Sequence, residues 1–377
     1  MSWITSPLGK ITTVLSGTTP ESSNPAYWSG NLVWVTPTDL GKLNEPVITT
    51  SSRLITAMGR ASCNLPLVPQ GAVVMSSRAP IGHLGIAGCS LHTNQGCKSF
   101  VCSSEIDPEF LYYTLKHRMA DIQALGSGAT FVEVSKSTLE AFEISFPKPI
   151  EKQRQIATRL KAQLAEADKA RQAAEAQLRE TTKLADAIVL DSIQYGRTTR
   201  HNLGEVLEEV KQGIGDSWAD YPVLGATRDG LAPAKEPPGK KPERYKPVFP
   251  GTVFYNPMRI LIGSIALVDD DDTPGITSPD YVALQGKKGV VDSRWFYCWL
   301  RSPLGEQCIL SLARGAVRER MLFNRLAEGE IELPDFTIQQ KASAALAALR
   351  PMRQAIESKL NDINLLPQKI LAQAFEM

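Results

Sequence analysis

The sequence predicts an α/β (α+β) fold in which two homologous globular units are separated by a long antiparallel two-helix coiled coil. Three observations predict it. Several motifs occur twice in the same order, each copy is followed by a stretch of helix-forming residues, and apolar side chains recur along both stretches at coiled-coil spacing. The 377 residues, 43% of them hydrophobic, suffice for two folded domains. We place the units at 1–149 and 197–336, and the helical segments at 150–196 and 337–377.

Four pairs of motifs carry the repeat. The pairs are PLGKITTVLSG (7–17) with NLGEVLEEVKQG (202–213), PQGAVVMSSRAPIGHLGIA (69–87) with FPGTVFYNPMRILIGSIAL (249–267), DPEFLYYTLKHRM (107–119) with DSRWFYCWLRSPL (292–304), and 126–156 with 312–342. The second pair predicts a glycine turn, a strand, a polar tip with an arginine, and another strand. The third predicts an aromatic-rich helix, and the fourth a strand, a proline and a glutamine-bearing helix start. Insertions in loops explain why the spacing between copies drifts.

The two helical segments predict a paired rod. Residues 150–194 contain no glycine or proline, and their apolar residues recur at a spacing near 3.5. We expect them to pack antiparallel against the second segment, with one unit at each end and a pseudo-two-fold relation. Pro351 and Pro367 predict a kink or break in the second segment. The residues expected at the helix–helix contact are Leu160, Leu164, Leu178, Ile188, Leu346, Leu349, Ile356 and Leu360.

Composition narrows the class of protein. No stretch approaches the roughly 18 apolar residues of a membrane span, and no signal peptide is expected. The six cysteines form no CxxC motif, which favours reduced thiols in the cytoplasm and no metal site. Residues 1–150 hold ten basic and ten acidic side chains, so the first unit lacks the overall basic charge that is typical of DNA-binding domains. A scaffold that binds protein therefore stays open as an alternative.

A search for enzymatic motifs predicts no catalytic residues and no cofactor site. The chain lacks a phosphate-binding GxxxxGK[ST] loop. Tyr255-Asn256-Pro257-Met258 only partly matches the tetrad of base methyltransferases, and Pro279-Asp280 is followed by Gln285 where a nuclease needs an acid. The acidic run 269–272 is typical of a solvated loop. A methyltransferase or nuclease fused to a recognition domain remains the enzymatic alternative.

The chain resembles the specificity subunits of type I restriction–modification systems. The resemblance rests on SGTTPESSNPAYWSGNLVWVTPTDL (16–40), SSRAPIG (76–82), TNQGC (93–97), SGAT (127–130) and FPKPIEKQRQI (146–156). It implies two target-recognition domains that each read half of a split site in double-stranded DNA, and helical regions that space them and bind two methyltransferase subunits. Restriction motor subunits complete such a complex, which serves phage defence. The resemblance places S-adenosylmethionine on the partner methyltransferase and no cofactor on this chain.

The second copy departs from the family pattern. TNQG is replaced by Thr277-Ser278-Pro279-Asp280, and only Trp218 and Tyr221 echo the tryptophan-rich run of the first copy. The expected function is nevertheless sequence-specific binding of a bipartite DNA site, without catalysis by this chain. The alternative within DNA modification is the specificity subunit of a type II-like methyltransferase or nuclease complex.

Candidate DNA contacts follow from the chemistry of base edges, because Arg pairs with guanine and Asn or Gln with adenine. In the first unit they are Ser77, Arg78, Asn94, Gln95, Thr130 and Lys136. In the second they are Asn256, Arg259, Ser278, Arg318 and Arg320, with Lys240, Lys241 and Arg244 from the proline-rich basic segment 233–247 as phosphate contacts. Structural alternatives stay open: a turn at Asn94-Gln95, a buried ion pair at Arg78, and a solvated linker for the basic segment.

Overall fold

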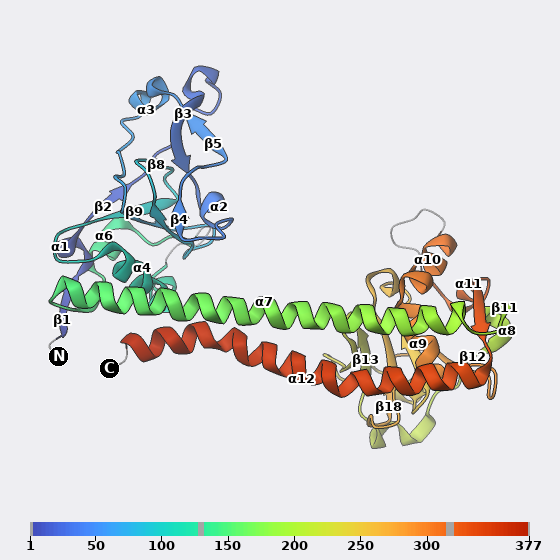
Figure 1. Cartoon of the computed structure of the whole chain (residues 1–377). Coiled ribbons are helices and arrows are strands. Elements are labelled where there is room, and N and C mark those ends of the chain that lie inside the picture. Colours follow the sequence, from blue (N-terminus) through green and yellow to red (C-terminus); the bar gives the residue numbers. More distant parts are fainter. Residues whose placement is uncertain (1–2, 127–131, 314–319, 376–377) are drawn as a thin grey trace. The chain divides into compact units, whose positions relative to one another are not determined.

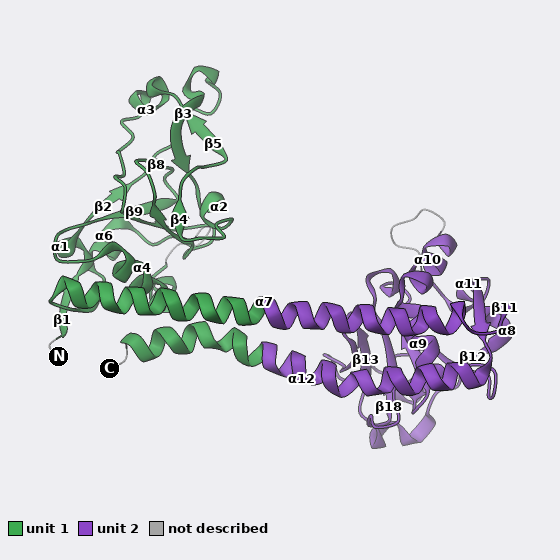
Figure 2. Cartoon of the chain, in the orientation of Figure 1, with its two compact units in different colours: residues 1–171, 361–377 green, residues 172–360 purple. Residues whose placement is uncertain are grey.

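The computed structural model divides into two compact units (Figure 2). Unit 1 comprises residues 1–171 and 361–377, and unit 2 comprises residues 172–360. Both long helices cross this boundary, so each unit holds one globular domain and part of each helix. The residues that the structure describes are 3–126, 132–313 and 320–375.

Unit 1 packs a five-stranded sheet of order β2-β9-β6-β7-β4 against α4 and the start of α7 (Figure 1). A second sheet has the order β5-β3-β8, and β1 pairs with β10. The strands are β1 Trp3–Pro7, β2 Thr12–Ser16, β3 Trp28–Val35, β4 Val47–Ile48, β5 Arg53–Ile55, β6 Val73–Ser76, β7 Leu84–Ala87, β8 His92–Thr93, β9 Cys97–Cys102 and β10 Glu143–Pro147. The helices are α1 Leu8–Ile11, η1 Pro25–Tyr27, α2 Pro37–Leu40, α3 Ala57–Ser62, α4 Pro108–His117, α5 Met119–Ala124, α6 Lys136–Ala141 and α7 Ile150–Gln194.

Unit 2 packs a four-stranded antiparallel sheet of order β12-β19-β16-β17 against α9. The pairs β11-β20, β13-β14 and β15-β18 complete its strands. The strands are β11 Thr198–Asn202, β12 Leu207–Glu209, β13 Leu224–Thr227, β14 Gly230–Pro233, β15 Lys246–Val248, β16 Thr252–Tyr255, β17 Ile265–Val268, β18 Gly275–Thr277, β19 Val282–Gly286 and β20 Glu330–Pro334. The helices are α8 Leu203–Val206, η2 Gly215–Asp220, η3 Pro242–Arg244, η4 Ile260–Ile262, α9 Ser293–Arg301, α10 Pro303–Leu312, α11 Phe323–Leu326 and α12 Phe336–Phe375.

The two units share one plan. The order β12-β19-β16-β17 repeats β2-β9-β6-β7, and the antiparallel pair β11-β20 repeats β1-β10. In each unit the second strand of that pair leads directly into a long helix. The predicted mixed fold with two homologous domains is confirmed.

A buried glutamine fixes the start of each long helix. In unit 1 the side chain of Gln153 is fully buried. Its Oε1 accepts a hydrogen bond from the backbone N–H of Asp107 at 2.8 Å, and its Nε2 donates to the carbonyls of Glu105 and Pro147, both at 2.9 Å. One amide thus bonds three backbone groups at the junction of helix, strand and loop, and the bond to Pro147 is buried.

Unit 2 repeats this arrangement with different neighbours in sequence. Gln339 accepts from the backbone N–H of Asp292 at 2.9 Å and donates to the carbonyls of Val290 (2.9 Å) and Pro334 (2.8 Å). Asp107 and Asp292 also cap the aromatic-rich helices α4 and α9 with their side chains. The two units therefore share individual side-chain hydrogen bonds as well as the order of their strands.

The long helices pack antiparallel within each unit. In unit 1 the start of α7 shares a core with the end of α12, through Leu160 and Leu371. In unit 2 the end of α7 shares a core with the start of α12, through Val189 and Leu346. Among the expected contact residues, the buried ones are Leu160, Leu346 and Ile356, and the half-buried ones are Leu164, Leu178, Ile188, Leu349 and Leu360. No described helix is both long and apolar enough for a membrane span.

Of the kink or break predicted at each proline of the second segment, the break is wrong, and the kink stays a prediction. α12 runs as one helix of 40 residues through Pro351 and Pro367. A proline removes one helical hydrogen bond and crowds the preceding turn. Here the helix packs on both sides of Pro351, through Leu346 and Ile356 (6% and 7% exposed), and this packing opposes the local penalty.

Candidate nucleic-acid interface

Three loops meet at one end of the sheet in unit 1: the β6–β7 hairpin tip, the turn before β9, and the segment before α6. They converge because β6 ends where β9 begins, with Ser76 paired to Cys97. The backbone N–H of Ser77 donates to the carbonyl of Gly96 at 2.8 Å, and that of Val134 donates to the carbonyl of Ser77 at 3.0 Å. The structure thus brings together predicted contact residues that are far apart in sequence.

Arg78 projects from the hairpin tip toward a carboxylate. Its Nη1 lies 3.5 Å from Oε2 of Glu133, whose Oε1 lies 3.3 Å from Nζ of Lys98. The side chains of Arg78 and Glu133 are each 34% exposed, whereas Lys98 is 7% exposed. Arg78 is therefore ion-paired without being buried, and part of its guanidinium faces solvent.

The expected direct contact from Ser77 does not fit the structure. Ser77 is fully buried, and its hydroxyl donates to the carbonyl of Gly96 at 3.3 Å. A side chain without exposed surface cannot touch DNA in this conformation. Ser77 instead joins the hairpin to the neighbouring turn.

The sequence left two roles open for Asn94 and Gln95, a structural turn and a DNA contact, and the structure assigns them different surroundings. Oδ1 of Asn94 accepts from the backbone N–H of Gly96 at 3.0 Å, so Asn94 stabilises the turn. Gln95 is exposed, and its Oε1 accepts from the hydroxyl of Thr19. A Cβ at Gly17 would collide with the backbone of this turn, so a glycine is needed where the loop after β2 meets the turn before β9. The Gln95 amide remains accessible for base contacts.

Lys136 lies on the solvent side of the same cluster. It begins α6, and its Nζ lies 3.5 Å from Glu140 one turn further along. The pair is largely exposed, so water screens it and the lysine is available to a phosphate. Thr130, also predicted to touch DNA, lies outside the described residues.

The same three elements meet in unit 2. The backbone N–H of Met321 donates to the carbonyl of Pro257 at 3.0 Å. This hydrogen bond is the counterpart of the one from Val134 to Ser77 in unit 1. Oδ1 of Asn256 accepts from the N–H of Met258 at 3.0 Å and closes the β16–β17 tip. Arg259 is exposed at this tip.

The turn before β19 supplies the rest of the cluster. Oγ of Ser278 accepts from the backbone N–H of Asp280 at 3.3 Å, much as Asn94 caps the turn of unit 1. Nη2 of Arg320 lies 3.4 Å from Oδ1 of Asp280, and the two side chains are 51% and 83% exposed. Arg318 lies outside the described residues.

The basic segment borders this cluster. Strand β15 pairs with β18 so that Lys246 lies opposite Thr277, which places the end of the segment beside the Ser278 turn. Lys246 itself is buried, donates to the carbonyl of Tyr281 at 2.8 Å, and cannot reach a phosphate. The exposed cations of the segment are Lys235, Lys240, Lys241 and Arg244.

Sequence reasoning did not place Lys98, Glu133 or Asp280 among the residues of the candidate interface. Lys98 is the only charged residue of β9, CKSFVC, and a lysine amid buried neighbours indicates a partner. Neither Glu133 nor Asp280 carries a comparable local signal, because each lies in a polar loop.

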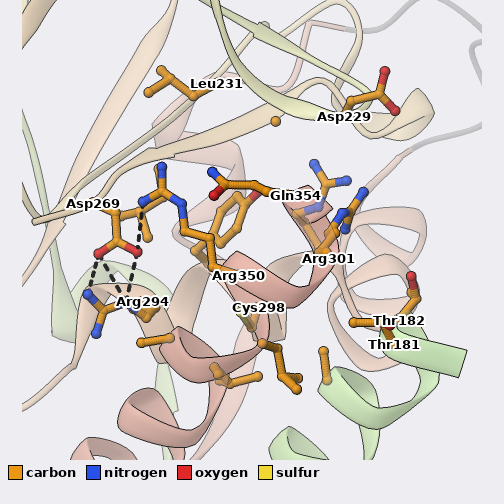
Figure 3. Close-up of a pocket in the computed structure, with 18 of the residues that line it drawn as sticks. Thr181, Thr182, Asp229, Leu231, Asp269, Arg294, Cys298, Arg301, Arg350 and Gln354 are labelled. Carbon is orange, nitrogen blue, oxygen red and sulfur yellow. Dashed lines mark hydrogen bonds and ion pairs between the residues drawn. The ribbon is translucent and has the colours of Figure 1, made fainter. Parts of the chain in front are cut away.

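Unit 2 also contains a cavity of about 370 Å³ between its globular domain and the two long helices (Figure 3). Charged pairs line it. Nε of Arg294 donates to both carboxylate oxygens of Asp269, at 3.0 and 2.9 Å, and Nη1 of Arg350 lies 3.5 Å from the same group. Arg350 also pairs with Asp272.

The prediction that residues 269–272 form a solvated loop is confirmed for Asp270 and Asp271, which are exposed, and wrong for Asp269 and Asp272. The side chains of Asp269 and Asp272 are only 14% and 15% exposed. Burial alone would raise the pKa of Asp269, but hydrogen bonds from Arg294 and the charges of Arg294 and Arg350 hold it below its ordinary value. Burial raises the pKa of the nearby Cys298 thiol to about 12, so it stays protonated at neutral pH. The ion pairs that line the cavity therefore join the globular domain of unit 2 to the long helix α12.

No metal-binding group was found in the part of the chain that the structure describes, where no three His, Cys, Asp or Glu side chains gather suitably. Residues 2–177 match the family model of the type I restriction modification DNA specificity domain. The MjaIX specificity subunit of a type I restriction enzyme from Methanocaldococcus jannaschii is 36% identical over 158 residues, which are 41% of this chain. The match spans 36% of that relative's own length.

Solved structures extend the likeness to the whole chain. The specificity subunit of a type I system from M. genitalium aligns with 100% of this chain and 96% of its own, at 16% identity and a TM-score of 0.50. The HsdS subunit from Thermoanaerobacter tengcongensis aligns with 99% and 96%, at 17% identity and a TM-score of 0.52. A chain from a study of the assembly of the type I system aligns with 99% and 97%, at 16% identity and a TM-score of 0.68. The sequence match to the family model thus covers the first half of the chain, and the structural likeness shows that the chain as a whole has the fold of these proteins.

Proposed function

We propose that this chain recognises double-stranded DNA and that each unit binds one half of a divided site. One observation carries the proposal. In both units the hairpin tip, the turn before a central strand and the segment before the last short helix converge, and both clusters present a guanidinium to solvent. Two such clusters on two copies of one fold suit a target with two parts.

The exposed groups have the chemistry of base and backbone contacts. Arg78 and Arg320 suit guanine, and the amide of Gln95 suits adenine. Lys240, Lys241 and the neighbouring Arg244 suit phosphates. Local clusters of this kind supply a binding face in a chain whose net charge is only +1.

We also propose that this chain is not itself a catalyst and that it recruits two methyltransferase subunits, which hold S-adenosylmethionine, together with restriction motor subunits. The long helices support a recruiting role. Leu184 and Leu190 on α7 are 49% and 47% exposed, and Met352 and Leu365 on α12 are 55% and 50% exposed. Large apolar side chains left in water on a helix favour contact with partner proteins.

Mapping methylated bases across the genome of the native cell, with this gene intact and deleted, tests the proposal. The intact cell should carry a bipartite motif with an unread spacer, and deletion should remove it. An unchanged methylation map would refute DNA recognition by this chain.

A pull-down from the same cells separates DNA recognition from a purely protein-binding scaffold. Treatment with nuclease should release the DNA while the methyltransferase subunits stay bound. The purified chain alone should neither methylate nor cut DNA, and either activity would contradict the non-catalytic assignment.

A further inference from the structure

The segment before the last short helix occupies the same position in both units. In each, a buried apolar residue, Val134 or Met321, donates its backbone N–H to the carbonyl of the hairpin tip at 3.0 Å. The residues just before these anchors are therefore equivalent. They are Glu133 in unit 1 and Arg320 in unit 2, side chains of opposite charge.

The ion-pair partners of these two residues also carry opposite charges in the two units. In unit 1 the carboxylate of Glu133 lies on the segment and its arginine partner, Arg78, lies on the hairpin tip. In unit 2 the arginine, Arg320, lies on the segment and its carboxylate partner, Asp280, lies on the turn before β19. Both clusters thus contain one arginine beside one carboxylate, built from different elements.

We propose that Arg78, from the hairpin tip, and Arg320, from the segment, have the same role of reading guanine, each oriented by its carboxylate, Glu133 or Asp280. This inference rests on the proposed function. Each arginine has one nitrogen near a carboxylate oxygen, at 3.5 Å for Arg78 and 3.4 Å for Arg320, which favours one orientation of the guanidinium. Its remaining N–H groups form a planar fork that matches O6 and N7 of guanine. The two carboxylates are positioning residues, because they act through the arginine.

The contacts around Glu133 support a positioning role in unit 1. Its Oε1 also lies 3.4 Å from the hydroxyl of the buried Ser77 and 3.3 Å from the ammonium of Lys98, which is itself 7% exposed. Two inner contacts hold the carboxylate while its other oxygen faces Arg78. The pair between Glu133 and Arg78 is one-third exposed, so this pair itself contributes little to folding, and Lys98 keeps its second partner, the carbonyl of Gln95 at 3.3 Å, when Glu133 is replaced.

Selection from a pool of duplexes with randomised sequence tests the inference. The full chain and its variants Glu133→Gln and Asp280→Asn are incubated with the pool, and the bound duplexes are sequenced. Each variant should weaken the preference for guanine at one position of one half-site by roughly 3- to 10-fold, part of what a bidentate contact supplies. Glu140→Gln is the matched control, since it removes the exposed partner of Lys136 in the same unit.

A second variant guards against misfolding. Arg78→Lys keeps the charge but lacks the fork, so it should lose the same guanine preference as Glu133→Gln while its thermal unfolding stays that of the control. A wild-type chain that selects no sequence would refute the proposed function. A wild-type chain that selects a divided site, with its guanine preference intact in Glu133→Gln and Asp280→Asn, would overturn this inference alone. Equal weakening for every sequence would also overturn it.

Discussion

The two units fasten their globular domains to the long helices by partly different means. In unit 1 the buried contact is apolar and aromatic, and the ion pair of Lys161 with Glu109 beside it is exposed. The ring of Phe375, near the end of α12, lies 5.5 Å from that of Phe110 and 5.2 Å from that of His117, centre to centre. The nearby Leu371 is 5% exposed in the same core.

Unit 2 also has an apolar contact between its domain and both long helices, through Val189, Ala342 and Leu346, and it adds a cluster of ion pairs. Asp269 and Asp272, from the loop after β17, pair with Arg294 on α9 and Arg350 on α12. The comparison teaches that the same frame accepts an apolar joint with or without a cluster of largely buried ion pairs. It also predicts that the two units differ in their response to salt and acid, because apolar burial is indifferent to both near neutrality while ion pairs are not.

The largest effect is expected where the units agree. Gln153→Ala and Gln339→Ala should each lower the free energy of unfolding of their own unit by about 3 kcal/mol, since each removes three bonds to backbone groups, one of them buried. Hydrogen exchange resolved by peptide would locate each loss. A large loss from one change and none from the other would show that the units are not built alike.

In the apolar joint, Phe375→Ala should destabilise unit 1 by about 2 kcal/mol, because a half-buried ring and its aromatic contacts are lost. Chemical denaturation at low and high salt provides the measurement. The loss should be the same at both salt concentrations. A loss that disappears in high salt would mean that the joint is not apolar.

In the ion-pair cluster, Asp269→Asn should destabilise unit 2 by about 1–2 kcal/mol, and by less in high salt. The folded-state pKa of Asp269 lies below its ordinary value of 3.8, so its contribution is present above that pH and is lost as the pH falls through the lowered pKa. Denaturation measured from neutral pH downward should show the wild-type advantage over Asp269→Asn vanish in acid. A constant difference at every pH would contradict the ionic account.

The smallest effect concerns DNA affinity. Lys240→Ala with Lys241→Ala should weaken binding to all sequences alike and flatten the dependence of log affinity on log salt concentration by about 2, because two phosphate contacts are lost. Lys287→Ala with Lys288→Ala, in the turn that follows the other end of β19, is the matched control. An unchanged slope would make the basic segment a solvated linker.

The features that could be predicted from the sequence are those that depend on the spacing of apolar residues and on the order of repeated motifs. The repeat, the aromatic-rich helices and the helical segments are carried by many residues each, so single exceptions such as Pro351 did not hide them. The grouping of Arg78 with Asn94 and Gln95 follows from matching motifs, and the structure brings their loops together.

Partners that are distant in sequence could not be predicted. Asp272 pairs with Arg350, which is 78 positions away, so a run of four aspartates looks solvated until the fold is known. A serine such as Ser77 has the same local signature whether it is buried or exposed. Charge pairs on loops, such as Glu133 with Arg78, depend on backbone contacts that no local pattern encodes.

The central claim is that two equivalent clusters each read one half of a divided site. The most direct test maps methylated bases in native cells whose chain is replaced by Arg78→Ala or by Arg320→Ala. We predict that each variant relaxes the motif in one half only, and that the two variants affect different halves. Relaxation of the same half by both, or of the whole motif by either, would contradict the claim.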